Sequence, residues 1–293
     1  LDEASECIDR PDPLWQRLTV HAAPGVSDLF LSLPAPLAGA TGRPRAAFDT
    51  LCRRAADAAH AYAKHVEALP PAPEGSFAIG EERLHLLMQE RLAVPWSPRE
   101  VAAMARRMAE ELKEAARVEA RRFHARRSAA EILEAAAAEW QPDGSDLLDA
   151  YRRMTARVRE RFEESGWVGF PEGDRLLVQL VPPFMRDLFP TAAYSAPGAF
   201  DPDQTGIFWV NDLAAVAKTD KARRAEIAQH FGLELTCAHE AYPGHHLQYV
   251  HQNRIPSVVR RMAHHAIYYE GWTLWCEQMT ADLMGDDAAN HYL

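Results

Sequence analysis

The stretch Ser97-Pro98-Arg99-Glu100 opens the part of the chain that decides the fold class. A serine followed three residues later by a glutamate is a capping box, in which each side chain accepts a hydrogen bond from the other residue's backbone N–H. Proline fits the first turn of a helix because its φ angle is already helical. This stretch therefore predicts a helix running towards Arg127. Ser128-Ala129-Ala130-Glu131 repeats the signature, and we expect the re-capped helix to end near Trp140.

Helical patterns are also present before and after this segment of the sequence. Apolar residues recur at three- and four-residue spacing, which is typical of a helix face packed on a core. Further helices are expected over residues 45–69, 80–92, 145–164, 220–242 with a continuation to 253, and 257–284. Glycine and proline become frequent only between 166 and 211, where 176–181 and 206–211 have the composition of short strands. We therefore predict a mainly α fold with a small β insert at about 166–211.

The N-terminal part of the chain has a different composition. Prolines and glycines recur throughout residues 1–43, so we expect loops and short turns there, packed as an irregular segment on the core. Residues 44–293 are then expected to form a single helical domain that carries the functional site. No period of 20–50 residues repeats along the chain, which disfavours a helical solenoid.

Composition and charge exclude several classes of protein. The 293 residues include 32 Lys and Arg against 42 Asp and Glu, a formal net charge of −10, which disfavours binding to nucleic acid. No apolar run reaches the roughly 20 residues that a membrane-spanning helix requires, so we expect no membrane span. The first residue is leucine, so a cleaved leader stays open; the lack of a recognisable signal peptide favours the cytoplasm slightly. The sequence leaves the oligomeric state open.

Candidate chemistry is concentrated in the run Ala238-His239-Glu240-Ala241-Tyr242-Pro243-Gly244-His245-His246-Leu247-Gln248. A His-Glu pair on a helix, followed within about two turns by another histidine, is the skeleton of a zinc-hydrolase site. In that arrangement the first imidazole binds the metal, the neighbouring carboxylate faces a metal-bound water, and the second histidine supplies another ligand. We therefore predict that His239 binds Zn²⁺ and that Glu240 is the general base.

The position of the second histidine departs from the usual spacing of four, because Pro243 occupies that place. His245 is six residues after His239 and His246 is seven. In a straight helix His246 would share the azimuth of His239 but lie about 10 Å further along the axis. A kink or π-bulge at Pro243 would bring one of the pair back towards the metal. We favour His245 as the ligand and keep His246 as the alternate.

A third ligand is predicted in the segment 268–277. Glu270 is an acidic residue in an otherwise aromatic and apolar run, where a carboxylate is costly unless it is paired or bound to a cation. The adjacent Gly271 suggests that another group approaches the backbone closely. Glu277, two turns further on the same face, is a candidate acceptor for the second nitrogen of a ligand imidazole. Tyr194 is the candidate donor to a developing oxyanion, with packing as its alternative role.

At these residues the sequence resembles a known family. The pattern His239-Glu240-x-x-Pro243-Gly244-His245-His246-x-Gln248, followed by Glu270-Gly271-Trp272-x-Leu274, is similar to that of the bacterial family called domain of unknown function 885. That family's pattern is similar to the gluzincin zinc peptidases. The resemblance spans about residues 80–284 and implies a large helical metallopeptidase-like domain. It also implies that family members continue past the Glu-Gly-Trp helix, so we expect this chain to be truncated at its C-terminus.

Three function classes follow. The first is a zinc-dependent hydrolase that cleaves peptide or small amide bonds, with Glu240 as general base. The second is a catalytically inactive helical scaffold that binds a ligand without turnover. The third is a di-iron helical bundle, which needs two Glu-x-x-His units and two further carboxylates. Only Glu82-x-x-His85 has that pattern, so we place this class last.

Overall fold

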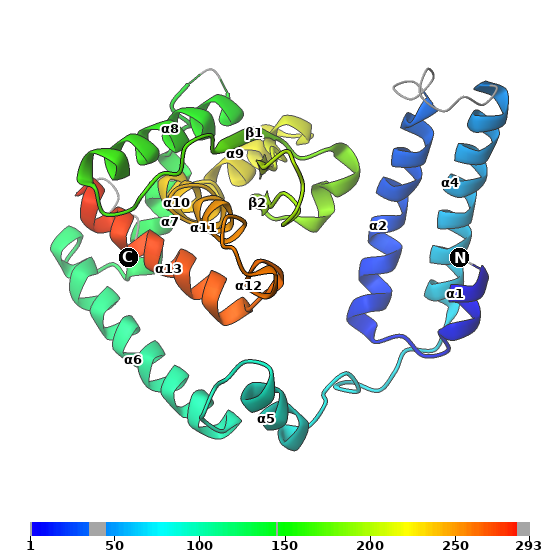
Figure 1. Ribbon diagram of the computed structural model, residues 1–293, viewed down its shortest axis with the longest axis horizontal. Coiled ribbons are helices and arrows are strands. Elements are labelled where there is room, and N and C mark those ends of the chain that lie inside the picture. Colours follow the sequence, from blue (N-terminus) through cyan, green and yellow to red (C-terminus); the bar gives the residue numbers. More distant parts are fainter. Residues whose placement is uncertain (1, 35–44, 145, 286–293) are drawn as a thin grey trace. The chain divides into compact units, whose positions relative to one another are not determined.

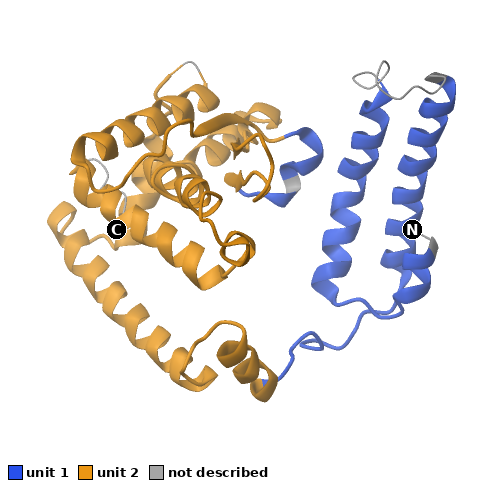
Figure 2. Ribbon diagram, viewed as in Figure 1, with its two compact units in different colours: residues 1–80, 182–190 blue, residues 81–181, 191–293 orange. Residues whose placement is uncertain are grey.

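The computed structural model describes residues 2–34, 45–144 and 146–285. The chain divides into two compact units (Figure 2). One unit contains Leu1–Gly80 together with Pro182–Pro190, and the other contains Glu81–Val181 together with Thr191–Leu293. Among the described residues, none of the helices has both the length and the apolar character that crossing a membrane requires.

The N-terminal unit is a helical hairpin (Figure 1). It contains α1 (Asp2–Cys7), α2 (Pro13–Ser32), α4 (Arg45–Ala68) and a 3₁₀-helix, η1 (Pro183–Leu188). Small side chains such as Ala23 on α2 and Ala59 on α4 are buried. The side-chain amide of Gln16 donates hydrogen bonds to carbonyls at the end of α4, including that of Val66 at 2.9 Å. The hairpin is thus held by small-residue packing along its length and by a polar tie at one end.

The expectation of irregular chain over residues 1–43 is wrong for the part that the structure describes. Pro13 occupies the first turn of α2, where a backbone N–H is not needed, and the side chain of Asp12 caps that turn by accepting from the Leu14 N–H at 2.8 Å. Pro24 lies inside the helix without ending it. Residues 35–43 lie outside the described residues. The expected domain boundary near residue 43 also differs from the structure, since the N-terminal unit extends to Gly80.

The C-terminal unit is mainly helical, as predicted. Its first four helices are α5 (Glu81–Glu90), α6 (Pro98–Phe123), α7 (Ala129–Glu139) and α8 (Leu147–Ser165). Both predicted capping boxes are present, at the start of α6 and of α7. The expected helix over 145–164 is α8, capped by Asp146. The N-terminal helices of this unit therefore follow local sequence signals.

A three-stranded sheet forms the β insert. It contains β1 (Arg175–Leu180), β2 (Ala192–Ser195) and β3 (Thr205–Val210) in the order β1-β3-β2, with β3 parallel to β1 and antiparallel to β2. The central strand alternates between buried and half-buried residues, and Phe208 and Val210 are fully buried. Strand β2 was not predicted, because its four residues are too few for a recognisable alternation.

The C-terminal helices are shorter than predicted. The segment expected as one helix from 220 to 253 is divided into α9 (Asp220–Ala228), α10 (Leu233–Glu240) and α11 (His245–Gln252), after a short 3₁₀-helix η2 (Ala214–Val216). Gly232, with a φ of 78°, separates α9 from α10 in a conformation that favours glycine. The segment expected over 257–284 forms α12 (Val258–Met262) and α13 (Ala266–Met284). The Gln252 amide donates to three carbonyls around the end of α12 and so replaces helical hydrogen bonds there.

The core of the C-terminal unit joins the sheet to α8 and α10. Tyr151 and Phe162 on α8 and Phe208 on β3 are fully buried, and the rings of Tyr151 and Phe208 meet edge to face at 5.6 Å. Cys237 and Ala238 on α10 belong to the same cluster. The helix that carries His239 is therefore packed against the most buried part of the unit.

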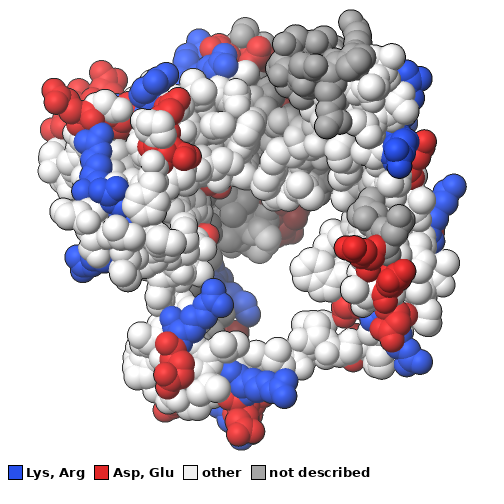
Figure 3. Space-filling model, turned by 45° about the vertical axis from the view of Figure 1, so that its right-hand side comes forward, with Lys and Arg blue, Asp and Glu red and all other residues white. Residues whose placement is uncertain are grey.

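Charged side chains are mixed in sign on the surface. On the face that Figure 3 shows, acidic and basic side chains are interspersed among the described residues. Along α6, Glu110 pairs with Lys113 at 2.9 Å and Glu119 with Arg122 at 2.7 Å. Such exposed pairs contribute little to stability, and they indicate a solvated helix face.

Phe208 provides a test of this core. We expect Phe208→Ala to lower the free energy of unfolding by about 3–5 kcal/mol, because it removes a fully buried ring from the central strand. Phe123→Ala is the matched control, since its ring is half exposed at the end of α6 and its loss should cost less than about 0.5 kcal/mol. Denaturant unfolding of both variants measures the difference; equal losses would contradict this description of the core.

Candidate metal centre

A complete break in the helix, rather than the predicted kink or π-bulge, brings the two histidines together. Helix α10 ends at Glu240, α11 begins at His245, and the Tyr242-Pro243 peptide bond in the connecting loop is cis. Gly244 lies directly against the end of α10, where a Cβ atom would overlap the carbonyl oxygens of Ala238 and His239. Glycine at this position therefore allows the first turn of α11 to lie beside the last turn of α10.

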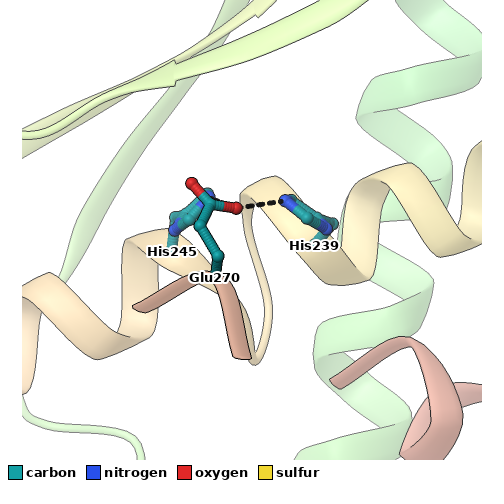
Figure 4. Close-up of side chains that lie close together, drawn as sticks. All are labelled: His239, His245 and Glu270. Carbon is teal, nitrogen blue, oxygen red and sulfur yellow. Dashed lines mark ion pairs between the residues drawn. The ribbon is translucent and has the colours of Figure 1, made fainter. Parts of the chain in front are cut away.

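Three predicted ligands meet at one point. Figure 4 shows His239, His245 and Glu270 close together, from α10, α11 and α13. The Nε2 atoms of His239 and His245 lie 3.6 and 3.7 Å from Oε2 of Glu270, and the donor atoms of the three residues all lie within 4.8 Å of one another. Tetrahedral zinc with bonds of about 2.0–2.1 Å needs donor separations of roughly 3.3–3.4 Å. The two nitrogen-to-oxygen distances are therefore close to those of a zinc site.

His239 is oriented by a carboxylate on its far side. Its Nδ1 lies 2.7 Å from Oε1 of Glu277, so the predicted contact of Glu277 with the imidazole of a candidate ligand is present, while the ligand role of His239 stays a prediction. Because a carboxylate accepts, Nδ1–H donates to Glu277, and in the neutral ring Nε2, the nitrogen on the side of Glu270, is then the one that has a lone pair for a metal. Burial lowers the pKa of His239, but the hydrogen bond that the ring donates to Glu277 and the charges of Glu240, Glu277 and Glu270 outweigh burial, and the net pKa is raised.

The pKa of His245 is shifted in the opposite direction. Burial, and to a smaller extent the charge of His239, lower the pKa of His245 to about 4. The ring is therefore neutral at pH 7, and a neutral imidazole has the free lone pair that metal binding requires. Its Nδ1 is buried and has no hydrogen-bond partner among the described residues. His239 is thus oriented by a hydrogen bond, whereas His245 is oriented by packing.

Glu270 is more exposed than the sequence suggested. Its side chain is 52% exposed, so the carboxylate does not lie in an apolar environment as expected. The expected close approach at Gly271 is also wrong, since no atom lies within 4 Å of a Cβ built there. The candidate metal centre is therefore open to solvent on the side of α13.

Glu240 has the electrostatic environment of a proton carrier. Burial raises its pKa to about 7; the charge of His239 opposes this effect, and the charges of Glu270 and Glu277 add to it to a smaller extent. A carboxyl group with a pKa near the working pH can both accept and release a proton. Glu240 is the last residue of α10 and follows His239 directly.

His246, the alternate ligand, lies away from the other three residues. Its ring is fully buried, with Nδ1 3.1 Å from the Tyr194 hydroxyl and Nε2 3.6 Å from Oδ2 of Asp174. The ring is therefore turned towards Asp174 and Tyr194, and His246 is not brought into the metal centre.

Tyr194, the predicted oxyanion donor, lies beside His245. Its ring stacks on that of His245 with centroids 6.3 Å apart and an interplanar angle of 16°. Its hydroxyl is engaged with His246, and burial raises its pKa. The structure gives Tyr194 a place next to a predicted ligand, and its role as a donor to an oxyanion stays a prediction.

A cavity of about 600 Å³ lies between α11, α12 and α13. Leu247, Gln248, Tyr268 and Trp272 are among its lining residues. Tyr268 and Trp272 lie two residues on either side of Glu270, so they project from a different face of α13. None of the three predicted ligands lines this cavity, and it is separate from the metal centre.

The comparisons with known proteins agree with the resemblance of the motif. The model of the family described as "Bacterial protein of unknown function (DUF885)" matches residues 16–292, and the chain belongs to this family. A comparison with curated proteins finds no match. The family description names no reaction, so any function has to be argued from the site itself.

The pKa of Glu240 predicts a pH-dependent effect in the metal-free protein. Folding raises this pKa from about 4.5 to about 7. Between pH 4.5 and pH 7, Glu240 is therefore protonated in the folded state and ionised in the unfolded state. The associated stability is present below pH 4.5 and is lost as the pH rises to 7, by at most about 3 kcal/mol. Glu240→Gln removes this loss, so in the presence of a chelator its melting temperature should exceed that of the wild type at pH 8 more than at pH 5. An equal difference at the two pH values would contradict the raised pKa.

Proposed function

We propose that this chain is a zinc-dependent hydrolase that cleaves peptide or small amide bonds. The observation that carries the proposal is the convergence of two imidazole nitrogens and one carboxylate oxygen from three helices. Two histidines and one glutamate, with a fourth position free, form a common ligand set of catalytic zinc sites. Glu240, which follows the first ligand in the chain, supplies the additional carboxylate that hydrolysis requires.

The chemistry of the donors supports zinc over other ions. Imidazole suits zinc and the later transition metals, whereas Mg²⁺ and Ca²⁺ prefer oxygen ligands. Two of the three donors are nitrogens; His245 is neutral at pH 7, and Glu277 orients His239. Within residues 2–34, 45–144 and 146–285, one cluster of three potential ligands is found, and Glu82 and His85 are not part of it. The di-iron alternative therefore gains no support from the described residues.

In the proposed reaction the residues of the chain bind, orient and carry a proton. When bound, zinc lowers the pKa of water to about 7 and polarises the substrate carbonyl. Glu240 accepts a proton from the attacking water as the new C–O bond forms, and delivers it to the leaving nitrogen as the C–N bond breaks. Glu277 keeps the His239 imidazole in the orientation in which Nε2 faces the centre. The exposure of Glu270 is consistent with access of a substrate from solvent.

The alternative of an inactive scaffold keeps the same geometry without turnover. A scaffold would bind ligands and even zinc, but it would have no use for a carboxyl group with a pKa near 7 beside the first ligand. This observation favours the hydrolase. Turnover measured on the wild type and on a Glu240 variant separates the two classes.

Glu270→Ala tests the ligand set. We expect the variant to bind zinc at least 100-fold more weakly, because a direct ligand should matter more than the supporting residues whose loss costs about 10–100-fold. The melting temperature in zinc should fall accordingly, by an amount equivalent to about 2.7 kcal/mol for a 100-fold change. In chelator it should stay close to that of the wild type, since the half-exposed carboxylate contributes little to the apo fold.

Glu160→Ala is the control for Glu270, since it removes an exposed glutamate of α8 that is outside the cluster. It should leave both melting temperatures unchanged. A shift for Glu270→Ala that is the same in chelator and in zinc would remove Glu270 from the ligand set.

Glu240→Gln tests the general base. The variant should retain stoichiometric zinc, because Glu240 is not one of the converging donors, and should lose hydrolysis of a peptide or amide substrate by several orders of magnitude. Zinc content and turnover of the same preparation measure both effects. Turnover equal to that of the wild type would exclude Glu240 from the reaction.

A further inference from the structure

An ionic cluster built around a buried carboxylate lies next to the metal centre and has no part in the proposed reaction. At its middle is Asp174, whose side chain is 4% exposed. Arg159 donates to both carboxylate oxygens of Asp174, at 2.9 and 3.0 Å, and the Tyr242 hydroxyl donates to Oδ2 at 2.7 Å. Nε2 of His246 lies 3.6 Å from the same Oδ2.

The burial of this cluster needs an explanation other than stability. An ion pair taken out of water loses hydration that its Coulomb attraction often fails to replace, so well-packed apolar residues frequently do as well. A buried carboxylate does, however, determine which nitrogen of a neighbouring imidazole carries the proton. Asp174 is in the position to do this for His246.

From Asp174 a chain of contacts leads to a predicted ligand. Nε2 of His246 faces the Asp174 carboxylate at 3.6 Å and has no hydrogen-bond partner among the described residues. The negative charge of Asp174 favours the tautomer with the proton on Nε2, in which Nδ1 accepts from the Tyr194 hydroxyl at 3.1 Å. The anchored ring of Tyr194 stacks on the imidazole of His245. Gly206 leaves room for these contacts, since a Cβ there would lie 2.5 Å from both the His246 Nδ1 and the Tyr194 hydroxyl.

His245 depends on such packing more than His239 does. Glu277 holds His239 through Nδ1, but Nδ1 of His245 has no hydrogen-bond partner among the described residues. The orientation of the His245 ring is therefore set by its neighbours, of which Tyr194 is the one stacked on it in parallel.

We propose that Asp174, acting through His246 and Tyr194, is a positioning residue that holds the His245 imidazole with its Nε2 towards Glu270. The inference rests on the proposed zinc site and adds to it a second supporting carboxylate. Glu277 supports one histidine ligand directly, and Asp174 supports the other through two intermediate side chains.

Zinc affinity of the full chain, measured by competition with a chromophoric chelator, tests the proposal. Asp174→Asn removes the acceptor charge, and Tyr194→Phe keeps the stacked ring but removes the hydroxyl that His246 holds. We expect each variant to bind zinc about 10–100-fold more weakly than the wild type. The double variant should bind zinc with the same affinity as whichever single variant binds it less tightly, because both substitutions act through the same chain of contacts.

Glu163→Gln is the matched control. Glu163 accepts a hydrogen bond from Nε of Arg159 at 2.8 Å but does not contact Asp174 or His246. Its variant perturbs the same arginine without breaking the chain of contacts, so its zinc affinity should lie within twofold of the wild type. A loss as large as that of Asp174→Asn would mean that the cluster acts on the fold in general, and would overturn the proposal.

A second readout does not depend on zinc. In ¹⁵N-histidine spectra of the metal-free protein, His246 should be the Nε2–H tautomer in the wild type; the Nδ1–H tautomer would overturn the proposal.

Folded Asp174→Asn and Tyr194→Phe variants with zinc affinity within twofold of the wild type would overturn the proposal while leaving the zinc site intact. If Asp174→Asn fails to fold, Tyr194→Phe decides alone. A wild type that binds no zinc would overturn the proposed function itself, and this inference with it.

Discussion

The contact of Gly244 with the end of α10 is the constraint on which the rest of the site depends. The carbonyls of Ala238 and His239 occupy the space that a side chain at this position would need, so α11 can begin there only because residue 244 is glycine. The loop is also hydrogen-bonded to α13, the helix of the candidate ligand Glu270, since Nε1 of Trp272 donates to the carbonyl of Pro243 at 2.9 Å. The same few residues therefore determine the separation of the two histidines and the position of α13 beside them.

The core of the C-terminal unit fixes the position of α10, the helix that carries His239. Helix α10 contributes Cys237 and Ala238 to the most buried cluster, directly before His239. On the other side, Gly206 of the central strand accommodates His246 and Tyr194. Tightly packed interiors have low compressibility, so residues anchored in them keep their positions relative to one another. The candidate ligands thus lie at the edge of a rigid core, while Glu270 reaches them from the solvent side.

Local signals in the sequence predicted much of this structure. The features that could not be predicted depend on contacts between residues far apart in the sequence. The capping boxes at Ser97 and Ser128 depend on residues three apart, so they could be recognised without any tertiary information. Glu277 could be predicted because it shares a helix face with Glu270. Asp174 could not, since nothing near it in sequence indicates that Arg159, Tyr242 and His246 will surround it. Helix α2 was missed for a related reason, because its prolines suggested turns while its packing on α4 is visible only in the fold.

The different burial of Glu240 and Glu270 explains how two carboxylates in one small site can have different roles in the proposed hydrolase. Glu270 is half exposed and keeps part of its hydration, so it can present a negative charge to a cation at little cost. Glu240 is largely removed from water and lies within reach of two other acidic groups, so its ionised form is disfavoured and its pKa rises to about 7. A bound divalent cation would lower that pKa again, because an opposite charge nearby stabilises the carboxylate. In the proposed hydrolase the proton affinity of Glu240 is therefore coupled to occupancy of the metal centre, and burial together with the neighbouring acidic charges separates a candidate ligand from the proposed proton carrier.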